Sequence, residues 1–324
     1  MNTTPSSHSV STTASDQDQP QIDATRRVPA TGERALVLGG GGSTGNAWLI
    51  GVIAGLFDAG LDVTTADLTI GTSAGATAAA QTAGATPTEL LAATLAAAPQ
   101  HGTAPVGPAR GRATGPVADH LERFRQIIAA SEDAADMRRR MGAAALERDA
   151  ASDGSAQARW RAVVAARLPA LRWPERTMLI TAVDAHTGAP IVFDRHSGVD
   201  LVDAVAASTS GGGSTYSIGG SQYIDGGYRS NAENADLAAG YGRVLVLSPL
   251  GGRSMYPPEW GVHLAAQVEA LRAGGSRVET VFPDSSSEHM FGARAMDPSL
   301  RPPAARAGYD QGKALAGSLA ELWR

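Results

Sequence analysis

Ser73 is the residue whose setting points most directly to chemistry. It stands in Gly71-Thr72-Ser73-Ala74-Gly75, a G-x-S-x-G motif between an apolar run and an alanine-rich stretch. Small flanking residues allow a sharp strand-to-helix turn, which strains the serine backbone and exposes its hydroxyl. The hydroxyl then lies at a helix N-terminus, where the helix dipole favours a developing negative charge. This context predicts a nucleophile for acyl transfer, in preference to a helix-capping serine in a tight glycine turn.

A glycine-rich segment, Gly39-Gly40-Gly41-Gly42, lies about 30 residues before the serine and follows another apolar run. Glycine lets backbone N–H groups turn toward a bound oxyanion, because no side chain blocks the approach. Acyl transfer needs such donors where the tetrahedral intermediate places its charge. We therefore predict an oxyanion hole formed by the backbone N–H groups of Gly40, Gly41 and Gly42.

The same glycines allow a second interpretation. Gly40, Gly42 and Gly45 fit the G-x-G-x-x-G pattern of a dinucleotide-binding turn, for which Asp62 or Asp67 would be the acidic partner. The G-x-S-x-G motif one strand later favours the oxyanion hole over this alternative.

Asp225 is the candidate general base. It precedes Gly226-Gly227 and follows the apolar pair Tyr223-Ile224 at the end of a predicted hairpin. A carboxylate there could accept the Ser73 proton directly, which gives a two-residue arrangement of nucleophile and base. An ordinary Asp-Gly turn is the structural alternative.

These residues need a scaffold, and the surrounding pattern predicts one. Residues 34–38 and 67–70 read as buried strands, each followed by a glycine turn and a helical stretch. Further strands are predicted at 177–183, 191–193, 243–247 and 277–282, with a hairpin at 216–224. Alternation of strands and helices predicts an α/β fold with a mainly parallel central sheet and helices on both faces.

The domain organisation follows from changes in composition. Residues 1–32 are polar and nearly free of large apolar side chains, so we predict a disordered tail. Residues 33–324 form one predicted domain. Within it, residues from about 87 to 174 contain helical segments separated by Gly/Pro-rich stretches, which predicts a helical insertion. This insertion could cover an active site or consist of ordinary scaffold helices.

Bulk properties exclude several classes of protein. The net charge of −5 argues against a nucleic-acid partner, and the absence of cysteine excludes disulfide scaffolds, thiolate metal sites and thiol nucleophiles. No apolar run is long enough for a membrane span, and the N-terminus lacks a signal-peptide pattern. We expect a cytoplasmic protein, although a secretion signal read by a dedicated system would leave no such pattern. Oligomeric state is left open.

Together, the three motifs resemble those of the patatin-like phospholipases, particularly the bacterial members. The order matches: a glycine turn after the first strand, G-x-S-x-G after the next and D-G-G much later. The resemblance extends to residues 181–184, 191–194 and 201–208, and covers about residues 35–248 apart from the insertion.

This resemblance implies a three-layer patatin-like fold and hydrolysis of acyl-lipid esters, with no metal and no organic cofactor. It implies that Ser73 is the nucleophile, Asp225 the base and Gly40 to Gly42 the oxyanion hole, with Gly71, Gly75 and Gly226 as supporting motif glycines. A lipid or other acyl ester is the expected substrate, and the resemblance also allows peripheral contact of the protein with a membrane. Trp160, Trp173, Phe124 and Arg138 to Arg140 could touch a lipid surface, but core packing and a solvated charged face are preferred for them.

Two positions depart from the family pattern. Thr44 stands where many members have Arg or Lys, so a cation beside the oxyanion turn is missing from this motif. Gly211-Gly212-Gly213 replaces an apolar, Pro-containing stretch shortly before Asp225. A flexible glycine run predicts either a loosely placed base or a different pocket.

Two other functions remain open from the sequence. The order Ser73, Asp225 and then His263 or His289 permits an α/β-hydrolase with a catalytic triad, whereas His186 and His196 read as loop residues. The chain could also be a non-catalytic module that binds lipid or a dinucleotide.

Overall fold

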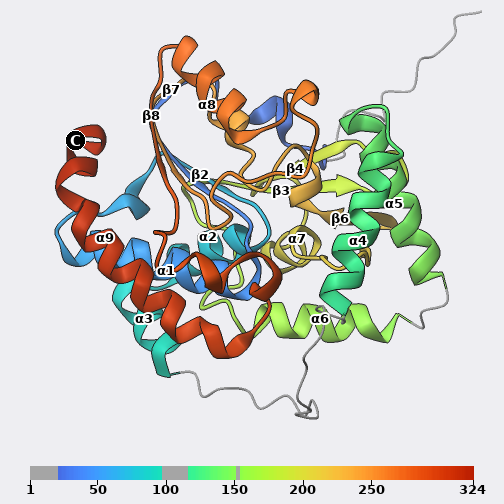
Figure 1. Ribbon diagram of the computed structural model, residues 1–324, viewed down its shortest axis with the longest axis horizontal. Helices are drawn as coiled ribbons and strands as arrows, with labels where there is room; N and C mark the ends of the chain where they lie inside the picture. Colours follow the sequence, from blue (N-terminus) through green and yellow to red (C-terminus); the bar gives the residue numbers. More distant parts are fainter. Residues whose placement is uncertain (1–20, 97–115, 151–153) are drawn as a thin grey trace, which may run out of the picture.

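A central sheet organises the molecule. The computed structural model describes residues 21–96, 116–150 and 154–324, and within these it contains an eight-stranded sheet (Figure 1). The strands are β1 (Gly32–Leu38), β2 (Leu68–Gly71), β3 (Thr177–Asp184), β4 (Pro190–Phe193), β5 (Tyr216–Ile218), β6 (Ser221–Asp225), β7 (Tyr241–Leu247) and β8 (Arg277–Val281).

The sheet order is β5-β6-β3-β2-β1-β7-β8, and β4 also pairs with β3. Every pairing among β3, β2, β1, β7 and β8 is parallel, whereas β3 pairs with β4 and β6, and β5 with β6, in antiparallel fashion. The predicted mainly parallel α/β sheet is therefore confirmed. Parallel pairing brings the carboxyl ends of β1 and β2 to the same edge, where the two glycine motifs follow them.

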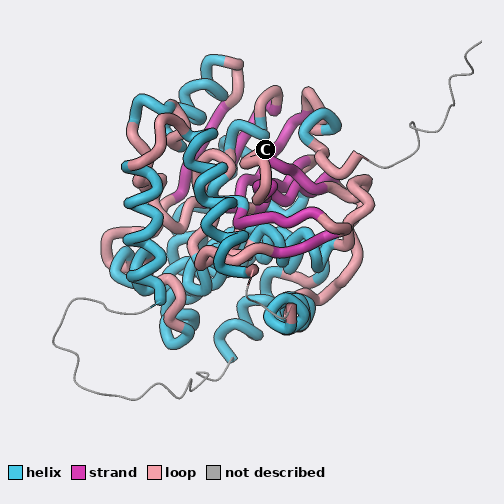
Figure 2. The backbone as a smooth tube through the Cα atoms, turned by 90° about the vertical axis from the view of Figure 1, so that its right-hand side faces the viewer, coloured by secondary structure: helices cyan, strands magenta, loops and turns pink. Residues whose placement is uncertain are grey.

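Helices cover both faces of the sheet, which gives three layers (Figure 2). Along β1, Leu36 and Leu38 enter one apolar core with α1 (Gly42–Asp58) and α9 (Arg301–Trp323), whereas Ala35 and Val37 enter a second core with α8 (Leu264–Ala273). This alternation follows the two-residue period of a strand. The described helices are α1 (Gly42–Asp58), α2 (Ala74–Gly84), α3 (Pro87–Ala96), α4 (Pro116–Ala129), α5 (Ala134–Asp149), α6 (Ser155–Ala165), α7 (Leu201–Ser208), α8 (Leu264–Ala273) and α9 (Arg301–Trp323).

Helices α1 and α9 cross with their backbones in close approach. A Cβ atom at Gly51 or Gly55 would overlap the carbonyl oxygen of Ala305 or Tyr309, and one at Gly312 would overlap that of Val52. Glycine is needed on both helices because any side chain would separate them. This packing holds the C-terminal helix against α1, the helix that begins at the glycine turn.

The predicted insertion region contains α3 to α6, with residues 97–115 and 151–153 outside the described part. Helices α4 and α5 stand beside the β6 side of the sheet in Figure 1 and share an apolar cluster with Ile224 and Tyr228. Trp160 donates its indole N–H to the Ala206 carbonyl, and Trp173 donates to the Val199 carbonyl. These two tryptophans pack against the protein's own core, as the preferred interpretation predicted.

The predicted tail extends too far at its C-terminal end. Residues 21–31 contact the body: Ala24 donates its N–H to the Val192 carbonyl, and Arg27 forms an ion pair with Asp194 at 2.9 Å. These long-range contacts, which composition alone does not reveal, order a polar segment. Residues 1–20 of the predicted tail lie outside the described residues.

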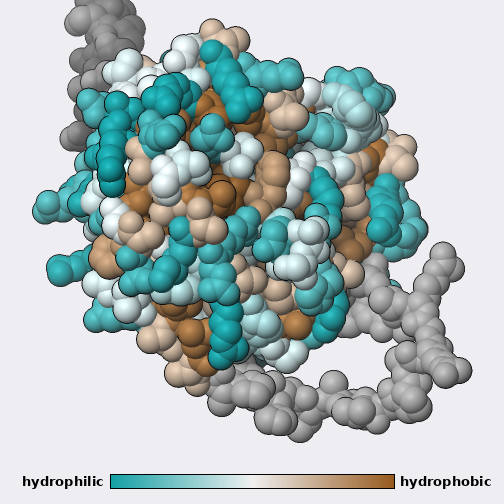
Figure 3. Space-filling model, turned by 60° about the vertical axis from the view of Figure 1, so that its left-hand side comes forward, coloured by the Kyte–Doolittle hydropathy of each residue, from teal (hydrophilic) through white to brown (hydrophobic). Residues whose placement is uncertain are grey.

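Large exposed apolar side chains are scattered over the surface. On the face in Figure 3, hydrophobic patches are interrupted by hydrophilic side chains, and the exposed large residues come from several elements. No helix among those described has the length and apolar character needed to cross a bilayer.

Candidate active site

Ser73 occupies a strained turn between β2 and α2. Its φ of 53° and ψ of −113° lie in a region that residues with side chains rarely adopt. Its N–H donates to the Ser208 hydroxyl at 2.9 Å. A Cβ at Gly75 would overlap the Leu38 carbonyl, so this motif glycine allows α2 to approach the end of β1. The sharp strand-to-helix turn predicted from the motif is present.

Asp225 lies at the end of β6 and faces the serine. The Ser73 hydroxyl donates to Asp225 Oδ2 at 2.9 Å, and the Gly227 N–H donates to Oδ1 at 2.8 Å. The Gly226 backbone packs against Thr181 on β3, and a Cβ at Gly226 would overlap Thr181. Burial raises the pKa of Asp225 to about 6, and the hydrogen bonds from Gly227 and Ser73 oppose this rise. The carboxyl group is therefore a stronger base than a solvated aspartate.

The glycine turn lies beside the serine. A Cβ at Gly40 would lie 3.5 Å from the Ser73 Cβ. However, the Gly40 N–H already donates to the Ala232 carbonyl at 2.7 Å. Gly41 is the N-cap of α1 and Gly42 is its first residue, and within the described part the N–H groups of both have no hydrogen-bond acceptor. The three predicted oxyanion donors thus differ. The Gly40 N–H is used within the protein and fixes the turn, whereas the N–H groups of Gly41 and Gly42 are available to bind an oxyanion.

Asn234 joins the elements that carry the two candidate catalytic residues. Its side-chain amide donates to the Thr72 hydroxyl at 3.0 Å and to the Gly226 carbonyl at 3.1 Å. It is fully buried, and its positive φ of 57° is tolerated by asparagine more readily than by most residues. Our reading of the sequence missed it, because only the fold places Asn234 between the two motifs.

Glu233 lies buried behind the glycine turn. A Cβ at Gly39 would lie 3.2 Å from the Glu233 Cγ, and the Ser248 hydroxyl donates to this carboxyl group at 2.6 Å. Burial raises the pKa of Glu233 to about 7, and the Ser248 hydrogen bond opposes the rise. This second buried acid was also missed, since no motif marks it.

The glycine run before Asp225 is anchored. A Cβ at Gly211 would lie 3.5 Å from Asp225 Oδ2. Arg148 of α5 donates to the Gly212 carbonyl at 2.6 Å, and Asp149 accepts hydrogen bonds from the Thr215 N–H and hydroxyl. Contacts from the insertion therefore replace the apolar stretch that the family pattern led us to expect, and Asp225 remains within hydrogen-bond distance of the serine.

Aromatic side chains of the insertion pack near the base. Tyr228, three residues after Asp225, lies 2.9 Å through its hydroxyl from His120 Nε2 on α4. Phe124 packs edge-on against Tyr228 and Tyr256, with ring centroids 5.3 and 5.9 Å apart respectively. Phe124 thus belongs to an internal aromatic cluster.

The candidate triad histidines have other partners. His263 Nε2 lies 2.8 Å from the Tyr256 carbonyl, and His289 Nδ1 lies 2.9 Å from the Ser286 carbonyl. Neither forms a hydrogen bond with Asp225 or Ser73 in the described structure. The described residues contain no group of three or more His, Asp or Glu side chains that could hold a metal ion.

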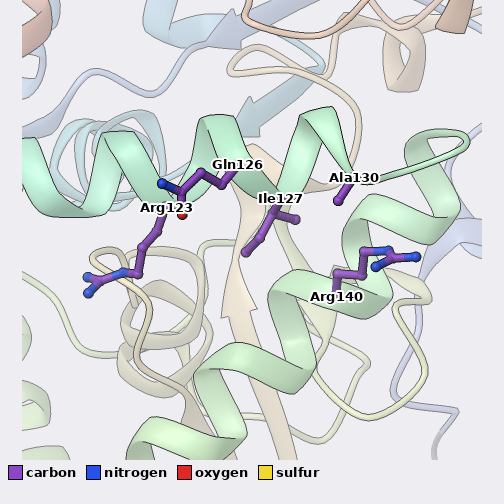
Figure 4. Close-up of a pocket in the computed structure, with 5 residues that line it drawn as sticks. All are labelled: Arg123, Gln126, Ile127, Ala130 and Arg140. Carbon is purple, nitrogen blue, oxygen red and sulfur yellow. The ribbon is translucent and has the colours of Figure 1, made fainter.

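A surface cavity of about 270 Å³ lies between α4 and α5, away from these motifs (Figure 4). Ile127 and Ala130 contribute its apolar lining, and Arg123 and Arg140 extend in opposite directions at its two ends. None of the motif residues lines it. The candidate site is therefore defined by the contacts around Ser73.

Comparisons with known proteins give a match at the level of a family. The family model described as "Patatin-like phospholipase" matches residues 36–236, which include all three motifs. A search of curated proteins found no significant match. The solved structure of VipD from Legionella pneumophila is similar at 13% identity and a TM-score of 0.39, covering 90% of this chain and 67% of that chain. At this level, the structural likeness adds nothing about function.

Proposed function

The chain belongs to the patatin-like phospholipase family, and from this premise we propose that it is a serine acyl hydrolase that cleaves carboxylic esters of lipids. Ser73 is the nucleophile and Asp225 the general base. The observation that carries the proposal is the direct hydrogen bond of 2.9 Å between the Ser73 hydroxyl and Asp225 Oδ2.

In the acylation step, Asp225 takes the Ser73 proton while Oγ attacks the ester carbonyl carbon. The tetrahedral intermediate collapses, the alcohol leaves with the proton returned by Asp225, and an acyl-serine remains. In the deacylation step, Asp225 removes a proton from water, which attacks the acyl-serine. As the second intermediate collapses, the bond between the acyl carbon and Oγ breaks, Asp225 returns its proton to Ser73 Oγ, and the carboxylic acid is released.

Gly41 and Gly42 are the proposed oxyanion donors. Their N–H groups lie at the N-terminus of α1, where the helix dipole adds to the stabilisation of negative charge. The Gly40 hydrogen bond to Ala232 fixes the turn before substrate arrives, so little reorganisation is needed during the reaction. Loss of one such donor lowers kcat about 100- to 1,000-fold in comparable sites.

A Ser-Asp-His triad is the main alternative. The partners of His263 and His289 favour the two-residue arrangement, because among the described residues neither ring forms a hydrogen bond with Ser73 or Asp225. A non-catalytic lipid- or dinucleotide-binding module is the second alternative. The strained Ser73 backbone and the raised pKa of Asp225 favour catalysis over it.

Ester hydrolysis by matched variants tests the proposal. A chain-length series of p-nitrophenyl esters and phospholipid vesicles should be hydrolysed by the wild type. Asp225→Asn should lower kcat about 100- to 10,000-fold, as expected for loss of a general base. His263→Gln and His289→Gln should retain wild-type kcat. Loss of activity in either histidine variant, while the protein stays folded, would refute the dyad in favour of a triad.

A further inference from the structure

The two candidate catalytic residues come from strands that are not neighbours. Ser73 follows β2 and Asp225 ends β6, and β3 lies between these strands in the sheet. Among the described strands, β2 and β6 each pair with β3 and do not pair with each other. Adjacent strands are about 4.8 Å apart, so two such spacings separate the chains that carry the pair. The 2.9 Å contact between Ser73 Oγ and Asp225 Oδ2 therefore depends on how both chains are held beside β3.

The Asn234 side chain binds the residue next to each member of this pair. Its Nδ2 donates at 3.0 Å to the hydroxyl of Thr72, which precedes Ser73. The same nitrogen donates at 3.1 Å to the carbonyl of Gly226, which follows Asp225. Asn234, Thr72 and Gly226 are all buried, so water does not compete for these hydrogen bonds. One amide group thus ties the nucleophile turn to the base turn across β3.

The partners of Asn234 determine which way its amide points. Arg229 Nη1 lies 3.2 Å from Asn234 Oδ1, and a guanidinium can only donate a hydrogen bond. The Gly226 carbonyl can only accept one, so it requires the NH2 group of the amide. Exchanging the two ends of the amide would place donor against donor and acceptor against acceptor. The bridge from Nδ2 is therefore the orientation that satisfies both partners.

The backbone at Asn234 is held independently of its side chain. Asn231 Oδ1 accepts the N–H of Glu233 at 2.9 Å and that of Asn234 at 2.7 Å. The next residue, Ala235, donates its N–H to Gln267 Oε1 at 2.9 Å. The φ of Asn234 is 57°, a value that glycine adopts without strain. Replacement by glycine therefore removes the bridging amide and keeps these backbone contacts.

We propose that Asn234 is a positioning residue that aligns the nucleophile with the base. Its amide holds the turns at Thr72 and Gly226 at the separation that allows the direct hydrogen bond of the dyad. Resting on the proposed function, this role predicts a loss of kcat with little change in substrate binding. Misplacement of a reacting group by about 1 Å can lower a rate about 100-fold.

The first arm of the test compares ester hydrolysis by the wild type and Asn234→Gly. The value of kcat should fall about 10- to 100-fold, while KM should stay within about twofold of wild type. Arg27→Gln, which loses the ion pair of the segment before β1, is the control for reduced stability and should keep the wild-type kcat. A folded Asn234→Gly variant with wild-type kcat, or with a raised KM alone, would overturn the proposed role.

The acceptor on the nucleophile side gives a second variant, which leaves Asn234 in place. Thr72→Val keeps the shape of the side chain and removes its hydroxyl. It should lower kcat about 3- to 10-fold, as expected for the loss of one hydrogen bond. Thr72→Ser restores the hydroxyl and should recover most of this loss. Equal kcat in Thr72→Val and the wild type would show that the bridge is not needed.

A double-mutant cycle distinguishes alignment of the base from a general loss of structure. Once Asp225→Asn has removed the base, adding Asn234→Gly should lower the residual kcat by less than about threefold, because no base remains to be aligned. A further loss as large as that caused by Asn234→Gly alone would contradict action through Asp225.

Crystal structures of the wild type and Asn234→Gly measure the alignment without hydrolysis. In the variant, the distance from Ser73 Oγ to Asp225 Oδ2 should exceed about 3.5 Å, beyond hydrogen-bond length. A distance that stays at 2.9 Å would overturn the proposed role of Asn234. Absence of ester hydrolysis by the folded wild type would instead refute the proposed function, and the distance in the variant would still decide whether Asn234 aligns the pair.

Discussion

Asp225 is buried at the end of β6, and burial raises its pKa to about 6. A general base must be deprotonated to accept the serine proton, so kcat/KM should rise with pH and level off above about 6. A pH–rate profile with a neutral ester measures this limb. A single limb near the ordinary aspartate value, about 4, would show that Asp225 is solvated or is not the base.

The Ser73 hydrogen bond lowers the pKa of Asp225 against the effect of burial. Removing the donor in Ser73→Ala should therefore raise the pKa of Asp225 further. NMR titration of the carboxyl carbon is the appropriate measurement. A lower pKa in Ser73→Ala would contradict the hydrogen bond seen in the structure.

Glu233 provides a separate prediction about stability. Its pKa is about 7 in the folded protein against 4.5 for the unperturbed group, so folding favours the protonated form. Its contribution to stability is therefore present below pH 4.5 and is lost as the pH rises through 7. Glu233→Gln should be more stable than wild type at pH 8 by about 1 to 3 kcal/mol, and this advantage should vanish below pH 4.5.

Urea unfolding at pH 8 and pH 4 measures this difference. The exposed Glu269→Gln is the control and should stay within about 0.5 kcal/mol of wild type at both pH values. If the Glu233→Gln variant were no more stable than wild type at pH 8, the buried carboxylate would not be a source of destabilisation.

Ser73 and Asp225 could be predicted from the sequence as candidate nucleophile and base, because each stands in a local motif whose glycines permit close backbone approach. The sequence did not predict Asn234 or Glu233. These side chains act on the turn from segments far away in the chain, and no local pattern encodes such contacts. The prediction for Gly40 was incomplete for the same reason: its N–H is used by Ala232, almost 200 residues later.

At the scale of elements, the contact between α1 and α9 is the most sensitive to substitution. A Cβ at Gly312 would overlap the Val52 carbonyl, so Gly312→Ala must push the helices apart. We expect a loss of about 1 to 3 kcal/mol in the free energy of unfolding, as for other overpacked interiors. Gly317→Ala on the same helix meets nothing within 4 Å and should be neutral or up to about 1 kcal/mol stabilising. Urea denaturation of the two variants tests the contact, and equal stabilities would contradict it.

The strands and the helices that follow β1 and β2 were predictable from short apolar runs ending in glycine. The backbone contact of α1 with α9 was not, because its glycines are separated by some 250 residues and look locally like interruptions of a helix. The role of the predicted insertion as a lid or a scaffold remains a prediction. Its helices do supply Arg148 and Asp149, which anchor the loop beside Asp225.

At the scale of the whole molecule, the segment before β1 binds the sheet region far along the chain. Arg27 pairs with the largely buried Asp194, whose lowered pKa reflects this arginine and local hydrogen bonds opposing the effect of burial. Arg27→Gln should reduce the free energy of unfolding at pH 7 by about 1 to 2 kcal/mol. Because the pKa of Asp194 is lowered, the loss should shrink as the pH falls and the carboxylate is protonated.

Thermal and urea unfolding at pH 7 and pH 3 measure the Arg27→Gln effect. Arg26→Gln, the adjacent exposed arginine, is the matched control and should behave as wild type. Equal stability of the two variants at pH 7 would show that the ion pair contributes little to the folded state. Composition predicted a tail through residue 32 because this segment contains few apolar residues. Composition does not reveal that Arg27 has a partner, Asp194, 167 residues further along the chain.

The central claim concerns the nucleophile, and covalent labelling by a fluorophosphonate tests it most directly. The wild type should react, with intact mass and peptide mapping placing the adduct on Ser73. Labelling should disappear in Ser73→Ala and be strongly slowed in Asp225→Asn, with circular dichroism confirming that both variants are folded. Undiminished labelling of folded Ser73→Ala, or no labelling of folded wild type, would contradict the account.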